Sequence, residues 1–74
     1  MALVTKLERQ SMSKNSVHGP VNSTYSVFDE DGKRYLQIDT YSSAQRKIRG
    51  KKSQTIQLNE QSVRQLKKLL DENF

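Results

Sequence analysis

The feature that most constrains this fold is an Asp31-Gly32 pair between two stretches of alternating polarity. Residues 21–28 and 34–41 are rich in β-branched and aromatic side chains, which suit a pleated strand. Asp-Gly favours a tight two-residue turn, because both positions tolerate a positive φ. We therefore predict a β-hairpin. Its turn fixes three cross-strand pairs: Glu30 with Lys33, Val27 with Leu36, and Tyr25 with Ile38.

This register sorts the hairpin side chains onto two faces. The expected core face carries Tyr25, Val27, Leu36 and Ile38. The opposite face carries Thr24, Ser26, Phe28, Tyr35, Gln37, Asp39 and Tyr41. Three aromatic residues among small polar ones are unusual for a solvent face, and two interpretations stay open. Either a helix or a second subunit covers them, or they stack unpaired bases, each contact contributing about 1–3 kcal/mol.

The rest of the chain predicts a sheet followed by a helix. Residues 54–58 resume the strand alternation, and Asn59 is placed to cap a helix. The apolar residues after it recur at helical spacing and form one stripe, namely Val63, Leu66, Leu69, Leu70 and Phe74. We expect an α+β fold: a small antiparallel β-sheet of three to four strands, then one C-terminal amphipathic helix.

Residues 1–20 are weakly patterned, and we expect an N-terminal arm there, with a single domain over residues 21–74. Leu3, Val4 and Leu7 share one face if they form a short helix. The polar stretch 11–20, which ends in Pro20, is either a mobile arm or one edge strand.

The positive charge of the chain is concentrated in one short block. The formal net charge is +5, and residues 1–45 and 53–74 are each balanced. The surplus falls in residues 46–52, whose five basic residues are Arg46, Lys47, Arg49, Lys51 and Lys52. Such a block is either a solvated loop or an electrostatic footprint for a polyanion. Its position beside tyrosine-bearing strands favours the second interpretation.

Catalytic and metal-binding patterns are not found in this sequence. The chain has one histidine, His18, and no cysteine, and its three glycines are scattered singly. These features do not match a metal site, a nucleophilic triad or a phosphate loop, so we expect a binding protein with no catalytic residues, metal or cofactor. No apolar run approaches the about 20 residues of a membrane span, so we expect a cytoplasmic or nucleoid-associated protein.

The order of motifs in residues 21–74 resembles the transcriptional positive cofactor four family. The matching pieces are Gly32-Lys33, the strand 36–41, Gly50-Lys51-Lys52, residues 55–60 and Gln65-Leu66-Lys67. The resemblance implies a small homodimer that binds single-stranded nucleic acid on antiparallel sheets and dimerises through its helices. This chain departs from the family at Asp39, where the family tends to place a basic residue, and in having no tryptophan after Tyr41.

We therefore predict a non-catalytic nucleic-acid-binding module, with single-stranded DNA favoured and RNA or duplex as other ligands, acting in transcription or DNA processing. The expected binding residues are Lys33, Arg34, Tyr35, Tyr41, Arg46, Lys47, Arg49, Lys51 and Lys52. The expected homodimer interface is Leu66, Leu69, Leu70 and Phe74. The alternative is a small protein-interaction regulator that docks its basic loop on an acidic partner surface.

Overall fold

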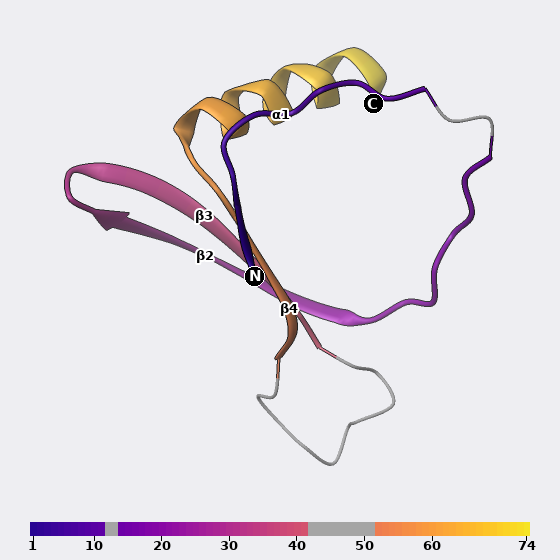
Figure 1. Ribbon diagram of the computed structural model, residues 1–74, viewed down its shortest axis with the longest axis horizontal. Coiled ribbons are helices and arrows are strands. Elements are labelled where there is room, and N and C mark those ends of the chain that lie inside the picture. The colour runs from indigo at the N-terminus through magenta and orange to yellow at the C-terminus, as the bar shows by residue number, and fades with distance from the viewer. Residues whose placement is uncertain (12–13, 42–51) are drawn as a thin grey trace.

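The computed structural model describes residues 1–11, 14–41 and 52–74 (Figure 1). Its elements are β1 (Ala2–Val4), β2 (Asn22–Glu30), β3 (Lys33–Tyr41), β4 (Lys52–Leu58) and α1 (Glu60–Asn73). The strands form one sheet in the order β1-β4-β3-β2. The predicted α+β fold, a four-stranded sheet followed by one helix, is confirmed. The sheet is mixed, however, because β1 runs parallel to β4.

The β2–β3 hairpin has the register that its turn predicts. Asp31 and Gly32 have φ values of 52° and 76°, as a tight primed turn requires. The cross-strand pairs follow from this turn and include Glu30 with Lys33, Val27 with Leu36, and Tyr25 with Ile38. The two faces of the hairpin are therefore those expected from the sequence.

The first residues form a strand, so the expected short helix at Leu3, Val4 and Leu7 is wrong. Ala2 pairs with Ile56 and Val4 with Leu58, which places β1 at one edge of the sheet. The residues pair with β4 although their spacing is helical. The edge of β4 supplies backbone hydrogen bonds, whereas a helix of one or two turns is not stable by itself. One edge strand was among the expectations for the arm of residues 1–20, and the structure has an edge strand there at Ala2–Val4, outside the stretch 11–20.

The chain after β1 runs along the helix (Figure 1). The backbone N–H of Leu7 donates to Gln65 Oε1 at 2.8 Å, and Gln65 Nε2 donates to the Leu7 carbonyl at 3.2 Å. This pair of bonds attaches the arm to α1 at a point distant in sequence.

The helix begins where the sequence predicts. The Asn59 side chain accepts a hydrogen bond from the Ser62 N–H at 3.0 Å, which satisfies one of the unpaired donors of the first turn. Ser62 is fully buried, and its Oγ donates to the Val4 carbonyl at 2.8 Å. The cap therefore connects the start of α1 to β1.

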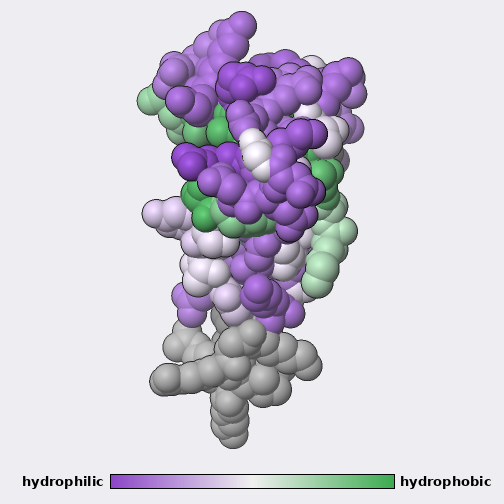
Figure 2. All heavy atoms as spheres, turned by 90° about the vertical axis from the view of Figure 1, so that its left-hand side faces the viewer, coloured by the Kyte–Doolittle hydropathy of each residue, from purple (hydrophilic) through white to green (hydrophobic). Residues whose placement is uncertain are grey.

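The helix contacts β3 and β4, on the sheet face that carries Leu36 and Leu58. Leu58 is 6% exposed and is the one buried hydrophobic residue among those the structure describes. On the same face Ile56 is 44%, Val27 56% and Tyr25 76% exposed. The predicted core face is thus the apolar face but is only partly covered, because α1 is short and lies over one end of the sheet. Apolar residues also reach the surface in Figure 2.

In the described residues, no helix is long and apolar enough to cross a membrane.

Candidate nucleic-acid interface

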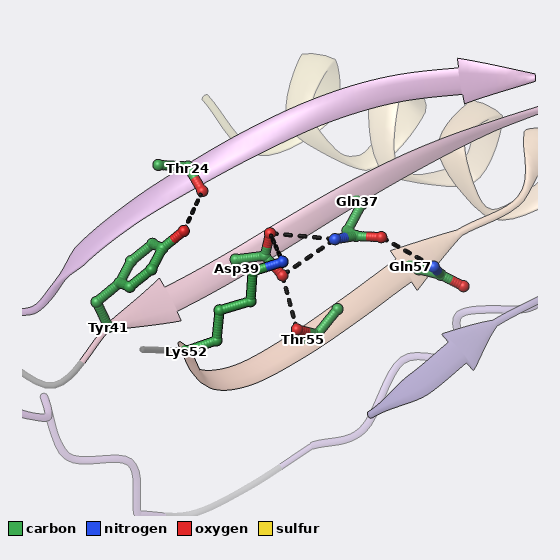
Figure 3. A network of polar contacts seen from close by, with 7 residues as sticks. All are labelled: Thr24, Gln37, Asp39, Tyr41, Lys52, Thr55 and Gln57. Carbon is green, nitrogen blue, oxygen red and sulfur yellow. Dashed lines mark hydrogen bonds and ion pairs between the residues drawn. The ribbon is translucent and has the colours of Figure 1, made fainter. Parts of the chain in front are cut away.

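The sheet face opposite the helix carries a continuous set of polar and aromatic side chains. Because side chains alternate along a strand, Tyr35, Gln37, Asp39 and Tyr41 of β3 all lie on this face. Figure 3 shows it from the front, with α1 behind the sheet. We call this surface the polar face. It comprises Thr24, Ser26 and Phe28 of β2, these four residues of β3, and Lys52, Thr55 and Gln57 of β4.

A buried carboxylate forms the centre of the polar face. Asp39 is 5% exposed and accepts a hydrogen bond from Thr55 Oγ1 at 2.6 Å. Gln37 Nε2 donates to both Asp39 oxygens, at 3.2 and 3.1 Å. Gln57 Nε2 in turn donates to Gln37 Oε1 at 2.9 Å, which extends the network across β3 and β4. Asp39 thus has the hydrogen-bond partners that a buried charge requires.

Lys52 is the cationic partner of this carboxylate. Its Nζ lies 3.3 Å from Asp39 Oδ2, and its side chain remains about half exposed. The hydrogen bonds from Thr55 and Gln37, followed by the contact with Lys52, hold the pKa of Asp39 below its usual value. Asp39 is therefore ionised at neutral pH and offsets the charge of Lys52.

The aromatic residues of the polar face have fixed positions. Phe28 and Tyr35 stack on each other, with ring centroids 5.5 Å apart and an angle of 23° between the rings. The hydroxyl of Tyr41 lies 3.1 Å from Thr24 Oγ1 (Figure 3). Tyr35 and Tyr41 are six positions apart along β3, a span of about 20 Å. The two tyrosines therefore mark the two ends of one face, and neither ring lies under the helix.

Arg34 is not brought to the polar face. It lies on the apolar side of the hairpin, where its Nε is 2.9 Å from Asp29 Oδ1. Its guanidinium lowers the pKa of Asp29 through this hydrogen bond, and its own pKa is raised in return. Of the other predicted binding residues, Lys33, Tyr35, Tyr41 and Lys52 share the polar side by alternation.

The remaining predicted binding residues, Arg46, Lys47, Arg49 and Lys51, lie outside the described residues. The described part of the chain contains nine basic and eight acidic residues, a net charge of +1. Tyr41 and Lys52 are the described residues that flank positions 42–51. Both side chains project onto the polar face. The described chain therefore ends at Tyr41 and resumes at Lys52 beside this face.

Sequence reasoning missed the hydrogen-bond network around Asp39. The signal that could have found it is the spacing Gln37-x-Asp39 opposite Thr55-x-Gln57, two short polar ladders on adjacent strands. Those pairs follow from the β3–β4 register, which no turn motif fixes. The described residues contain no group of three or more His, Cys, Asp or Glu side chains that would hold a metal ion.

The helix stripe, expected to be a dimer interface, divides into two parts. Leu66 and Leu69 are half-buried within the chain itself, whereas Leu70 is 42% and Phe74 99% exposed.

Comparisons with protein-family models, with curated proteins and with solved structures found no match in any of the three. The resemblance to the positive cofactor four family therefore stays a prediction from the order of motifs.

Proposed function

We propose that the polar face binds single-stranded nucleic acid, with single-stranded DNA as the favoured ligand. In this proposal the cationic residues of the 46–52 block neutralise phosphates, and Lys33 extends the positive track. Tyr35 and Tyr41 supply ring surface on which bases stack. The observation that carries the proposal concerns Tyr41 and Lys52, the described residues that flank positions 42–51. Both project onto the same face as Tyr35.

A single strand suits this surface better than a duplex. The polar face is formed by strands, and the helix lies on the other side of the sheet, so the described residues present no helix for a major groove. Aromatic stacking requires unpaired bases and tolerates any sequence. The proposed role is therefore non-catalytic, with little base specificity. We propose that this role is cytoplasmic and belongs to transcription or DNA processing, in which single-stranded intermediates arise.

The test compares aromatic residues of the polar face with one that lies off this face. Tyr35→Ala and Tyr41→Ala should each weaken the binding of a fluorescent oligo-dT about 5- to 150-fold, the equivalent of about 1–3 kcal/mol per stacked base. Phe74→Ala is the control, because Phe74 follows α1, on the other side of the sheet, and is 99% exposed. Fluorescence anisotropy measures each affinity, and duplex of equal length serves as competitor. Equal losses for all three variants would contradict the proposed face.

The second candidate is a protein-interaction regulator that docks its cationic block on an acidic partner. The partly uncovered apolar face favours it, since exposed Val27 and Ile56 are typical of a protein contact. This function predicts a different result in the same assay: oligo-dT binds weakly, and neither Tyr35→Ala nor Tyr41→Ala changes its affinity.

A further inference from the structure

The outer edge of β2 is the longest unpaired strand edge in the described residues. β2 has nine residues and pairs only with β3, because it is last in the sheet order. The opposite edge is the three-residue β1. β2 contains no proline and no lysine or arginine, the residues that commonly protect an edge against pairing with another chain.

The backbone groups that face outward can be identified from one hydrogen bond. The Arg34 N–H donates to Glu60 Oε2, on the β4 side of β3. Arg34 is therefore not hydrogen-bonded to Asp29, its opposite residue on β2, and the antiparallel pattern then alternates along the hairpin. It follows that Ser23, Tyr25, Val27 and Asp29 direct their N–H and C=O groups away from β3. Of the backbone hydrogen bonds among described residues, none involves this edge apart from the β2–β3 ladder itself.

We propose that a second copy of this chain pairs with the edge, β2 against β2 in antiparallel orientation, about a two-fold axis at Ser26. This register overlaps all nine residues of the strand. It makes hydrogen-bonded pairs of Tyr25 with Val27 and of Ser23 with Asp29 from the second copy. Ser26 faces its own equivalent in a non-hydrogen-bonded pair, in which the two Cα atoms and side chains lie closer than in a hydrogen-bonded pair.

The side chains of β2 are complementary to themselves in this register. Its two charged residues, Asp29 and Glu30, face Ser23 and Asn22 of the second copy, so no like charges meet. Tyr25 and Val27, which are 76% and 56% exposed in one chain, pack against each other twice across the axis. Aromatic and β-branched cross-strand pairs are among the most favourable in sheets.

The single chain exposes more surface than a compact monomer of its mass. The accessible area is 6918 Å² for 8.6 kDa. A folded monomer of that mass has about 4,700 Å², so the excess is about 2,200 Å² per chain. A standard interface buries about 1,200–2,000 Å² in total, or about 600–1,000 Å² of each partner, so a dimer contact would cover part of this excess. On the helix stripe, Leu70 and Phe74 remain exposed, whereas Leu66 and Leu69 are already half-buried within the chain.

The pairing also bears on the proposed nucleic-acid binding, and this step rests on that function. An axis at Ser26 would join two polar faces into one eight-stranded surface, since β2 side chains keep their face under this symmetry. The two ends that carry Tyr41 and Lys52 would lie toward opposite ends of it. A ligand that engages both would have to cross the full length of β2, about 30 Å.

A cross-linking experiment tests the axis without any nucleic acid. The natural chain has no cysteine, so Ser26→Cys introduces a single thiol at the axis. The two Cα atoms there would be about 4.5–5.5 Å apart, within disulfide range. Mild oxidation should therefore give a covalent dimer within minutes. Ser23→Cys is the matched control, since it faces Asp29 and should cross-link at least tenfold more slowly. Equal rates for the two variants would overturn the register.

Sedimentation of the full-length chain separates edge pairing from the other ways to dimerise. The unmodified chain should sediment as a dimer at micromolar concentration, and Val27→Lys, which places a charge on the edge strand, should give a monomer. Ile56→Lys on the same face, and Leu70→Glu on the helix, should leave the dimer intact. Circular dichroism checks that each variant is folded. A monomeric unmodified chain, or a dimer lost in Leu70→Glu but kept in Val27→Lys, would overturn the proposal. Because no oligonucleotide is present, either failure is independent of the proposed binding function.

Discussion

The ion pair between Lys52 and Asp39 gives a quantitative prediction for nucleic-acid binding. Lys52 is one of five basic residues in the 46–52 block, but its charge is offset by a buried carboxylate 3.3 Å away. Asp39→Asn removes that negative charge and retains a similar shape and a hydrogen-bond acceptor for Thr55. The variant should therefore free Lys52 to contact a phosphate.

The size of the effect follows from counterion release. Each phosphate neutralised on a single strand contributes about −0.7 to the slope of log affinity against log salt. With Lys52 paired, the other four block charges contribute about −2.8 to the slope, whereas five contribute about −3.5. Between about 50 and about 200 mM salt, these contributions alone correspond to affinity losses of about 50-fold for the unmodified protein and about 130-fold for Asp39→Asn, and a phosphate contact of Lys33 would steepen both slopes equally.

Fluorescence anisotropy with oligo-dT at several salt concentrations measures both slopes. Asp29→Asn is the control, because it releases Arg34 from an exposed ion pair on the opposite side of the hairpin. That variant should keep the slope of the unmodified protein. The reasoning fails if Asp39→Asn leaves the slope unchanged, or if Asp29→Asn steepens it equally. Thermal unfolding of each variant confirms that the comparison is between folded proteins.

Two further predictions concern stability. Hydrogen bonds from Thr55 and Gln37 and the contact with Lys52 lower the pKa of Asp39 below 3.8, so its stabilising contribution is complete above about pH 3.8 and is lost as the pH falls through the lowered value. Acid unfolding followed by circular dichroism should therefore be steeper below pH 3.8 in the unmodified protein than in Asp39→Asn, and identical curves would contradict this. Asn59→Ala removes the helix cap and should lower the free energy of unfolding by about 1 kcal/mol in urea denaturation. Asn73→Ala, which loses only an exposed bond to the Leu69 carbonyl, should change it much less.

The parts of the fold predicted correctly from the sequence are those that local chemistry determines. Asp31 and Gly32 define a turn, the turn defines a register, and the register assigns every hairpin side chain to a face. Asn59 caps the helix through a bond to Ser62, three residues later. Neither inference requires knowledge of distant contacts, and both are confirmed.

The parts that the sequence could not reveal depend on long-range pairing. The strand Ala2–Val4 pairs with residues more than 50 positions away, and three residues carry too little pattern to predict that. The position of Arg34 illustrates a second limit. Alternation places it on the apolar side, but its charge and its proximity to Tyr35 suggested a shared track. Its ion pair with Asp29 shows that a basic residue in a hairpin can serve the hairpin itself.

The carboxylate of Asp39 lies at the centre of the face that we propose binds an anionic polymer. A negative charge there would repel the ligand, unless burial and pairing offset it. Asp39 is buried and has its hydrogen bonds satisfied by Thr55 and Gln37, so little of its charge reaches the surface. It also holds Lys52, the last residue of the 46–52 block and the first of β4, over the polar face. Among the described residues of the face, Lys52 lies at one end and Lys33 at the other, and the surface between them is close to neutral. Under the proposed function a nucleic-acid strand is attracted first to the end with Lys52, where the 46–52 block adds its charge, and then extends over Tyr41 toward Tyr35. Stacking, rather than charge, would then determine how much of the face the strand covers.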